Sequence, residues 1–80
     1  SMKASYLHTL IDDCVTTGEY LKGLQDAMYH SHQSLDSTAL ESCFALLRYL
    51  SELHANQQGE ILKACQQLDI VNNAVNGGGA

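Results

Sequence analysis

Proline and tryptophan are absent from this 80-residue chain, and phenylalanine occurs once. Runs of β-branched residues, which favour strands, are also few. Because nothing in the sequence interrupts a helix in the way that proline does, the chain is expected to be all-α. Its length allows one domain, which would bury only about 60% of the surface that the unfolded chain exposes.

Basic residues are scarce. Lys3, Lys22, Arg48 and Lys63 are scattered along the chain and face nine carboxylates, which gives a formal net charge of −5. A nucleic-acid binder needs a basic patch to displace counterions from phosphates, and these four residues cannot form one. The same scarcity argues against an anionic membrane surface. No apolar run approaches the ~18 residues of a spanning helix, so neither nucleic acid nor membrane is expected as a partner.

The three cysteines, Cys14, Cys43 and Cys65, are an odd number and stand far apart in the sequence. No basic segment followed by a long apolar stretch marks a signal peptide at the N-terminus. The expected location is therefore the reducing cytoplasm, where these thiols would serve as small apolar side chains.

A seven-residue apolar repeat runs through the first part of the chain. Leu7, Cys14, Leu21 and Met28 recur at this interval. The repeat predicts an amphipathic helix over about residues 4–30.

The second helix has clearer start signals. Asp36 is a candidate N-cap, and Thr38 with Glu41 forms a competing capping box, so either places the start near residue 37. One line of this helix then repeats every seven residues through Leu40, Leu47, His54, Ile61, Leu68 and Val75. This repeat predicts a helix over about residues 37–75.

These elements give one helical domain over residues 4–76. The polar connection between the helices, residues 31–34, has the length expected between antiparallel helices. Ser1 before Met2 is typical of a residue left by tag cleavage, so residues 1–3 are interpreted as a tag remnant and a disordered N-terminus. The glycine-rich residues 77–80 are expected to form a flexible tail.

Gly59 raises an alternative to two helices. A glycine inside a helix costs roughly 1 kcal/mol relative to alanine, so a third helix could begin at Glu60 and fold back. Thr16 and Glu19 raise the same question at Gly18, because they match a capping box. The seven-residue phase continues through both glycines, which favours two continuous helices in a long antiparallel hairpin. A three-helix bundle remains the alternative.

A hairpin closed near residues 33–36 pairs residues whose numbers sum to about 69, which sets Leu24 opposite Ala45 and Leu7 opposite Leu62. Helix 2 should then overhang helix 1 beyond about residue 66. Its apolar band is also too wide for one neighbouring helix. The surplus predicts a homodimer that forms a four-helix bundle and a second protein partner. The expected partner or dimer interface consists of Phe44, Leu46, Tyr49, Leu53, Leu68, Val71 and Val75.

The same pairing brings the polar interruptions of the two helices together. Cys14 and Thr17 on the first helix should face Ser51 and His54 on the second, as a polar core layer that fixes the register. A thiol–imidazole catalytic pair is not favoured, because no orienting carboxylate or oxyanion donor accompanies it.

A zinc site at His30 and His32 is not favoured either, since residues two apart point to different sides of a helix. No cofactor, no metal and no catalytic residue is therefore expected.

Charged residues at helix-face spacing are interpreted as exposed pairs that each stabilise the helix by a few tenths of a kcal/mol. The pairs are Glu19–Lys22, Lys22–Asp26, Arg48–Glu52 and Glu60–Lys63.

The function expected from these patterns is that of a small, non-enzymatic regulatory or adaptor protein that binds through the helix faces of a homodimer. One alternative is a purely structural, self-assembling helical protein. Another is a ligand-binding or metal-binding bundle that uses the layer of Cys14 and His54.

Overall fold

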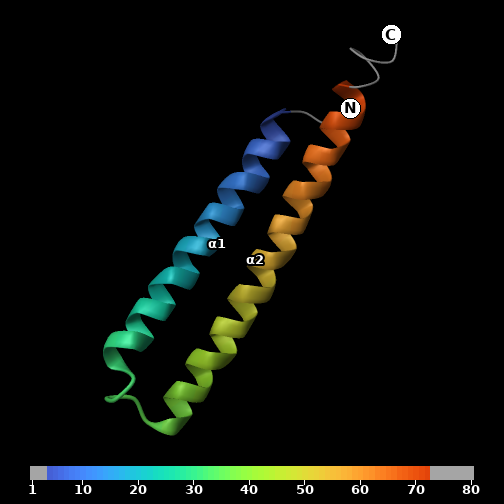
Figure 1. Ribbon diagram of the computed structural model, residues 1–80. Coiled ribbons are helices and arrows are strands. Elements are labelled where there is room, and N and C mark those ends of the chain that lie inside the picture. Colours follow the sequence, from blue (N-terminus) through green and yellow to red (C-terminus); the bar gives the residue numbers. More distant parts are fainter. Residues whose placement is uncertain (1–3, 73–80) are drawn as a thin grey trace.

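Two long helices make up the structure, a computed structural model that describes residues 4–72 and the side chains of residues 4–68. Helix α1 spans Ala4–Ser31 and helix α2 spans Ser37–Asn72, and the two run antiparallel (Figure 1). No strand occurs within this range. The predicted all-α helical hairpin is thus confirmed. The expected last turn of helix 2, the tag remnant and the tail lie outside the described residues.

Side-chain and backbone hydrogen bonds at the connection fix where each helix ends. The backbone N–H of Ser34 donates to the carbonyl of Ser31 at 2.9 Å. The Asp36 carboxylate accepts a hydrogen bond from the backbone N–H of Ala39 at 2.7 Å, so Asp36 is the N-cap of α2. Of the two cap arrangements left open by the sequence, the structure therefore has the one built on Asp36, and Thr38 lies inside the helix.

Both glycine positions at which a break was considered lie inside continuous helices. Gly18 belongs to α1 and Gly59 to α2, and no glycine within the described residues has a positive φ angle. The three-helix alternative is therefore wrong. The seven-residue apolar repeat, which continues without a shift through each glycine, correctly predicted continuous helices.

The register differs from the one expected. Tyr6 and Leu10 share a pocket with Ala64 and Gln67, so paired residue numbers sum to about 73 instead of 69. The pairings of Leu24 with Ala45 and of Leu7 with Leu62 are wrong, because both α2 residues are exposed.

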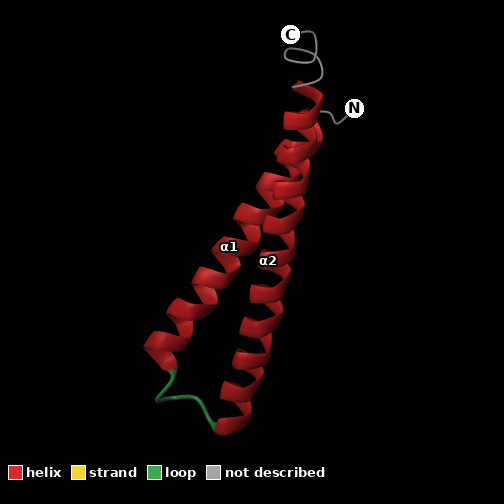
Figure 2. Cartoon of the chain, turned by 45° about the vertical axis from the view of Figure 1, so that its right-hand side comes forward, coloured by secondary structure: helices red, strands yellow, loops and turns green. Residues whose placement is uncertain are grey.

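The shape of the connection explains this shift. It continues along the long axis before the chain reverses, and α2 begins beyond the end of α1 (Figures 1 and 2). Part of the overhang expected at the open end is therefore found at the turn. With paired numbers near 73, Ala4 lies level with about residue 69, so α2 passes the start of α1 by only a few described residues.

The hairpin is a thin rod with no second layer. Its extents are 64 × 16 × 15 Å and its radius of gyration is 18.6 Å, against about 12 Å for a compact domain of this length. Within the described residues, no large side chain is fully buried. Stable domains bury apolar surface between at least two packed layers, so one copy of this chain does not form a conventional core.

Candidate interaction surfaces

The seam between the helices is built from small side chains. Cys14 and Thr17 on α1 and Ala64 on α2 are the buried residues of the described range. The Thr17 hydroxyl donates a hydrogen bond to the Asp13 carbonyl at 3.0 Å, so its polar group is satisfied within its own helix. Because these side chains are short, the larger apolar residues lie along the borders of the seam and stay partly in solvent.

The structure brings together part of the expected polar layer. A β-carbon placed on Gly18 would stand 3.2 Å from Nε2 of His54, so this imidazole packs directly against the α1 backbone. Cys14 and Thr17 are buried near the same level, His54 is half-buried, and Ser51 is exposed to solvent. Ser51 therefore lies outside the layer in a single copy, because it is turned towards the border of α2.

One polar atom in the seam has no partner. The Oε1 atom of Gln57 is buried and accepts no hydrogen bond within the described residues. Gln57 follows His54 by three residues, so it lies on nearly the same side of α2, but it was not among the residues expected in the polar layer. A buried amide oxygen without a donor weakens the pairing of the two helices.

The large apolar side chains that stay exposed fall into two groups on each helix. At 100° per residue, Tyr6 and Tyr20 lie within about 40° of each other on α1, and Ile11 lies about 180° from Tyr20. On α2, Phe44 and Leu62 are in line, and the exposed Leu46 and Tyr49 lie about 160° and 140° from Phe44. The seam lies between the two groups of each helix, so the rod carries apolar residues on two opposite sides.

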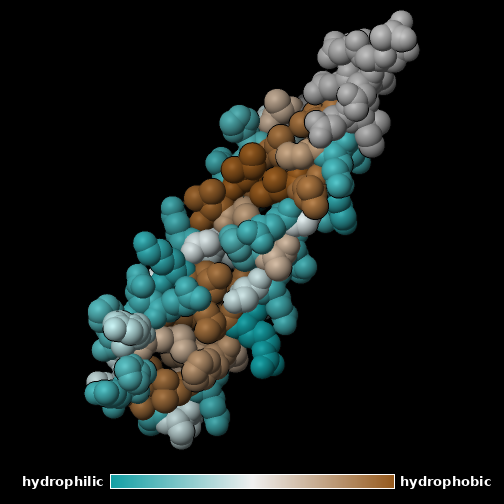
Figure 3. Space-filling model, viewed as in Figure 1, coloured by the Kyte–Doolittle hydropathy of each residue, from teal (hydrophilic) through white to brown (hydrophobic). Residues whose placement is uncertain are grey.

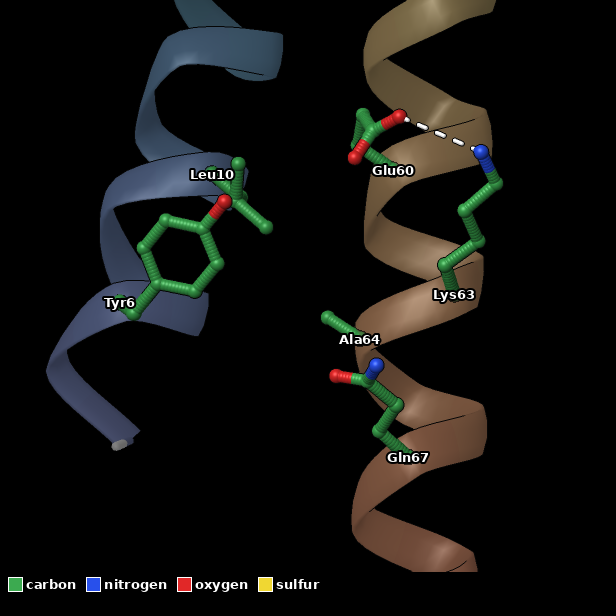
Figure 4. Close-up of a pocket in the computed structure, with 6 residues that line it drawn as sticks. All are labelled: Tyr6, Leu10, Glu60, Lys63, Ala64 and Gln67. Atoms are coloured by element: carbon green, nitrogen blue, oxygen red, sulfur yellow. Dashed lines mark hydrogen bonds and ion pairs between the residues drawn. The ribbon is translucent and has the colours of Figure 1, made fainter. Parts of the chain in front are cut away.

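The pocket near the open end shows which groups share a side. Tyr6 on α1 and Gln67 on α2 line it together (Figure 4). Gln67 is 18 residues, or five whole turns, after Tyr49, so these two residues share one border of α2. Tyr20 and Tyr49 therefore lie on the side that bears the pocket.

We name the two sides by their apolar residues. Face A carries Ile11, Val15, Tyr29, Phe44 and Leu62. Face B carries Tyr6, Tyr20, Leu46, Tyr49 and Leu53. All of these residues are exposed except Leu53, which is half-buried.

The two faces differ in where their charged residues lie. On face A, Lys22 lies about 20° from Ile11 and Arg48 about 40° from Phe44, so charged groups occupy its middle. Figure 3 views this face and shows a hydrophobic group near the open end and another near the turn, with hydrophilic side chains between them. Face B carries its charged residues Asp13, Glu60 and Lys63 in the half near the open end. In its turn-side half the residues one turn from Tyr20 and Leu46 are uncharged, and Glu52 lies at the outer border.

The interface expected from the sequence is divided between these faces. Leu46, Tyr49 and Leu53 lie on face B, whereas Phe44 lies on face A. Leu68 is half-buried near the open end. Val71 belongs to α2, but its side chain lies outside the described part, as does the whole of Val75.

The contribution of α1 to both faces was missed. The expected interface contained no residue of α1, whereas Ile11, Val15 and Tyr20 are all exposed. The signal was present in the spacing, because Ile11 and Tyr20 are nine residues apart and must point to opposite sides of a helix.

The pocket on face B is shallow and small. It has a volume of about 200 Å³ and is lined by Tyr6, Leu10, Glu60, Lys63, Ala64 and Gln67. The Lys63 ammonium lies 3.5 Å from the Glu60 carboxylate, and both groups are largely exposed (Figure 4). Of the four expected charge pairs, this one alone is within ion-pair distance among the described side chains. Such an exposed pair contributes little to stability.

The histidine, cysteine and acidic side chains in the described part of the chain are the groups that a metal site would use. No group of three or more histidine, cysteine or acidic side chains there is arranged to hold a metal ion. The His32 ring lies 3.0 Å from the Tyr29 carbonyl at the end of α1, and the rings of Tyr29 and His30 meet edge to face at 5.2 Å. These contacts place both histidines at the helix end.

No family model matches this sequence, and no curated protein or solved structure is significantly similar to it. Neither helix, over the residues described, has the length and hydropathy that crossing a bilayer requires.

Proposed function

We propose that this chain is a non-enzymatic protein-interaction module, of the regulatory or adaptor type, that pairs with a second copy of itself and binds another protein through a free helix face. The observation that carries the proposal is that large apolar side chains lie exposed on two opposite faces of a rod with almost no buried core. Its three free cysteines fit the reducing cytoplasm.

The lack of a core is the first support. Ordering the backbone costs roughly 1–2 kcal/mol per residue, and apolar burial must offset most of that cost. In one copy, the buried residues of the described range are only Cys14, Thr17 and Ala64. A second hairpin packed on one face would cover tyrosine and leucine side chains and would supply the missing layer in a four-helix bundle.

The second support is that two faces need covering. A symmetric pair of hairpins that packs through one face leaves the opposite face of each copy exposed. Contiguous apolar surface of this kind is typical of a protein-binding site. A second, different partner would cover it, and the dimer would present this surface twice.

Sedimentation equilibrium of the full chain tests the self-association. We expect a species of twice the 8.7 kDa chain mass at micromolar concentration, in exchange with the single chain at lower concentration. A species of 8.7 kDa at all concentrations up to about 1 mM, where association is too weak to matter, would refute the proposal.

Paired variants test for the second partner. The Ile11→Glu/Leu62→Glu variant charges face A, and the Leu46→Glu/Leu53→Glu variant charges face B. If the proposal is correct, one variant loses self-association, and the other remains dimeric but no longer retains a protein that the wild-type chain co-purifies. Retained proteins that bind both variants equally well would count against a helix-face site.

Self-assembly without another partner is the competing function, and the apolar residues on both faces favour it. Copies that stack through face A and face B in turn would form an open array, since two different surfaces on one molecule do not close into a pair. Growth of the sedimenting mass well beyond a dimer, abolished by either paired variant, would identify this alternative.

A further inference from the structure

We infer that the second copy packs against face B, centred on its turn-side half at Tyr20, Leu46, Tyr49 and Leu53, and that face A remains free for the other partner. This inference rests on the proposed function. It adds which surface forms the dimer and which surface is left.

The composition of this half of face B is that of an interface core. Tyr20 and Tyr49 are 64% and 62% exposed, and Leu46 lies between the seam and Tyr49. Small residues lie in line with the tyrosines, Ala27 with Tyr20 and Ser42 with Tyr49. Interface cores are poor in charge and rich in tyrosine, and small residues beside large ones allow side chains to interlock.

Charge selects a second copy as the occupant. Each copy carries a formal charge of −5, so two copies repel each other unless the surfaces that meet are uncharged or cancel. In a two-fold dimer the same patch meets itself, and any charge in the patch is brought close to its own copy. The turn-side half of face B keeps this repulsion small, because Glu52 lies at its outer border and no other carboxylate lies within one turn of Tyr20, Leu46 or Tyr49 on that side. Asp13 shares the side of Tyr20 but lies two turns nearer the open end.

Face A is less suited to contact with its own copy, because charged residues lie within it. Lys22, Asp26 and Arg48 lie along its middle, between its two apolar groups. Burying them against a second copy would remove their hydration, and each would need a partner of opposite sign at the same place. A different protein can provide such groups at chosen positions.

The available area agrees with a modest dimer. The turn-side half of a rod 64 Å long and 16 Å wide is a strip of about 500 Å² in projection, and its accessible surface is larger because side chains protrude. A stable pair of proteins typically buries about 800 Å² on each partner. The turn-side half supplies most of this area, and the adjoining surface of face B supplies the rest.

Matched aromatic substitutions in the full chain test the assignment. Tyr49→Glu changes face B, and Phe44→Glu changes face A on the same helix at nearly the same exposure, 59%. On α1, Tyr20→Glu and Tyr29→Glu form the corresponding pair. By sedimentation equilibrium we expect the face B variants to weaken the dimer at least about 30-fold, and the face A variants to change its dissociation constant by less than about threefold. Circular dichroism at 222 nm checks that each variant is helical.

The wild-type chain provides a second test that does not depend on the folding of variants. Nitration of tyrosine, followed by peptide mass spectrometry, measures the accessibility of each ring. As the protein concentration rises through the dimer range, we expect Tyr20 and Tyr49 to become protected and Tyr29 to stay reactive.

The outcomes separate the two ideas. A chain that remains monomeric refutes both the proposed function and this inference. A dimer that is weakened by Phe44→Glu and Tyr29→Glu, or equally by all four substitutions, or by none of them, leaves self-association standing and overturns the assignment to face B. Protection of Tyr29 without protection of Tyr49 overturns it as well.

Discussion

At the scale of single residues, the three helical glycines have different surroundings. A β-carbon on Gly23 or Gly59 would meet nothing within 4 Å, whereas one on Gly18 would stand 3.2 Å from the His54 ring. Gly18 is therefore the position at which the absence of a side chain matters, because it lets the imidazole pack on the α1 backbone.

Alanine substitutions at the three glycines measure this difference. Gly23→Ala and Gly59→Ala should each raise the free energy of unfolding by roughly 0.5–1 kcal/mol, because alanine has the higher helix propensity. The free energy of unfolding of Gly18→Ala should be about 1 kcal/mol lower than that of the other two variants, since the His54 ring must move to make room for the methyl group. Urea unfolding at one fixed protein concentration gives all three values. If Gly18→Ala stabilises as much as the others, the ring does not pack as described.

The N-cap at Asp36 is a second single-residue determinant. Asp36→Ala should lower the free energy of unfolding by about 1 kcal/mol, because the Ala39 N–H loses its acceptor. Thr38→Ala is the matched control, since Thr38 headed the competing capping box and its loss should change stability by less than about 0.5 kcal/mol. Thermal unfolding followed by circular dichroism compares them, and the opposite order would restore the capping box as the start of α2.

At the scale of the helices, the seam depends on short side chains. Ala64 is 2% exposed and lies at the level of Leu10 and the pocket. A longer side chain at this position would force the helices apart at the open end, whereas the exposed Ala45 on the same helix has room for one.

Leucine substitutions at these two alanines test the close approach of the helices. Ala64→Leu should destabilise the hairpin by about 1–3 kcal/mol through overpacking. Ala45→Leu should stay within about 0.5 kcal/mol of the wild type. Chemical unfolding at matched concentration provides the comparison, and equal effects at both sites would mean that the helices are not held together at Ala64.

At the scale of the whole molecule, charge and apolar surface oppose each other. Each copy carries a formal charge of −5, which opposes the proposed dimer, while burial of the exposed tyrosines and leucines would favour it. The balance between them depends on ionic strength, because salt screens the repulsion and leaves apolar burial largely unaffected.

Self-association should therefore strengthen with salt. Raising sodium chloride from about 20 mM to 500 mM shortens the screening length from roughly 20 Å to 4 Å, so the dimer dissociation constant should fall several-fold. Sedimentation equilibrium at both salt concentrations measures it. A dissociation constant that rises with salt would mean that ion pairs across the interface hold the copies together.

The helices themselves were predictable from local patterns. The repeat from Leu7 to Met28 and the cap at Asp36 located α1 and α2 to within a residue where the structure describes them. The continuity of the helix through Gly59 was also predictable, because a helix that ended there would have shifted the phase of the seven-residue apolar repeat. These are short-range properties, set by propensity and by contacts one or two turns apart.

The pairing of the helices could not be read in the same way. The length of the connection limits the register of the two helices but does not fix it, because the connection can continue along the axis of the first helix before the chain reverses. A shift of one helix against the other by one turn also leaves the facing apolar residues nearly unchanged. The pairing of Leu7 with Leu62 failed for that reason. Which border of α1 joins which border of α2 also depends on the three-dimensional packing.

The sequence by itself determined two amphipathic helices, the end of the first, the start of the second and a surplus of apolar side chains, because helix periodicity and composition are local and additive. Only the tertiary structure decided that this surplus is divided between two opposite faces, with Phe44 on one and Tyr49 on the other. The physical reason is that the register and the handed packing of two antiparallel helices are set by side-chain contact across the seam, here by short residues at Cys14, Thr17 and Ala64.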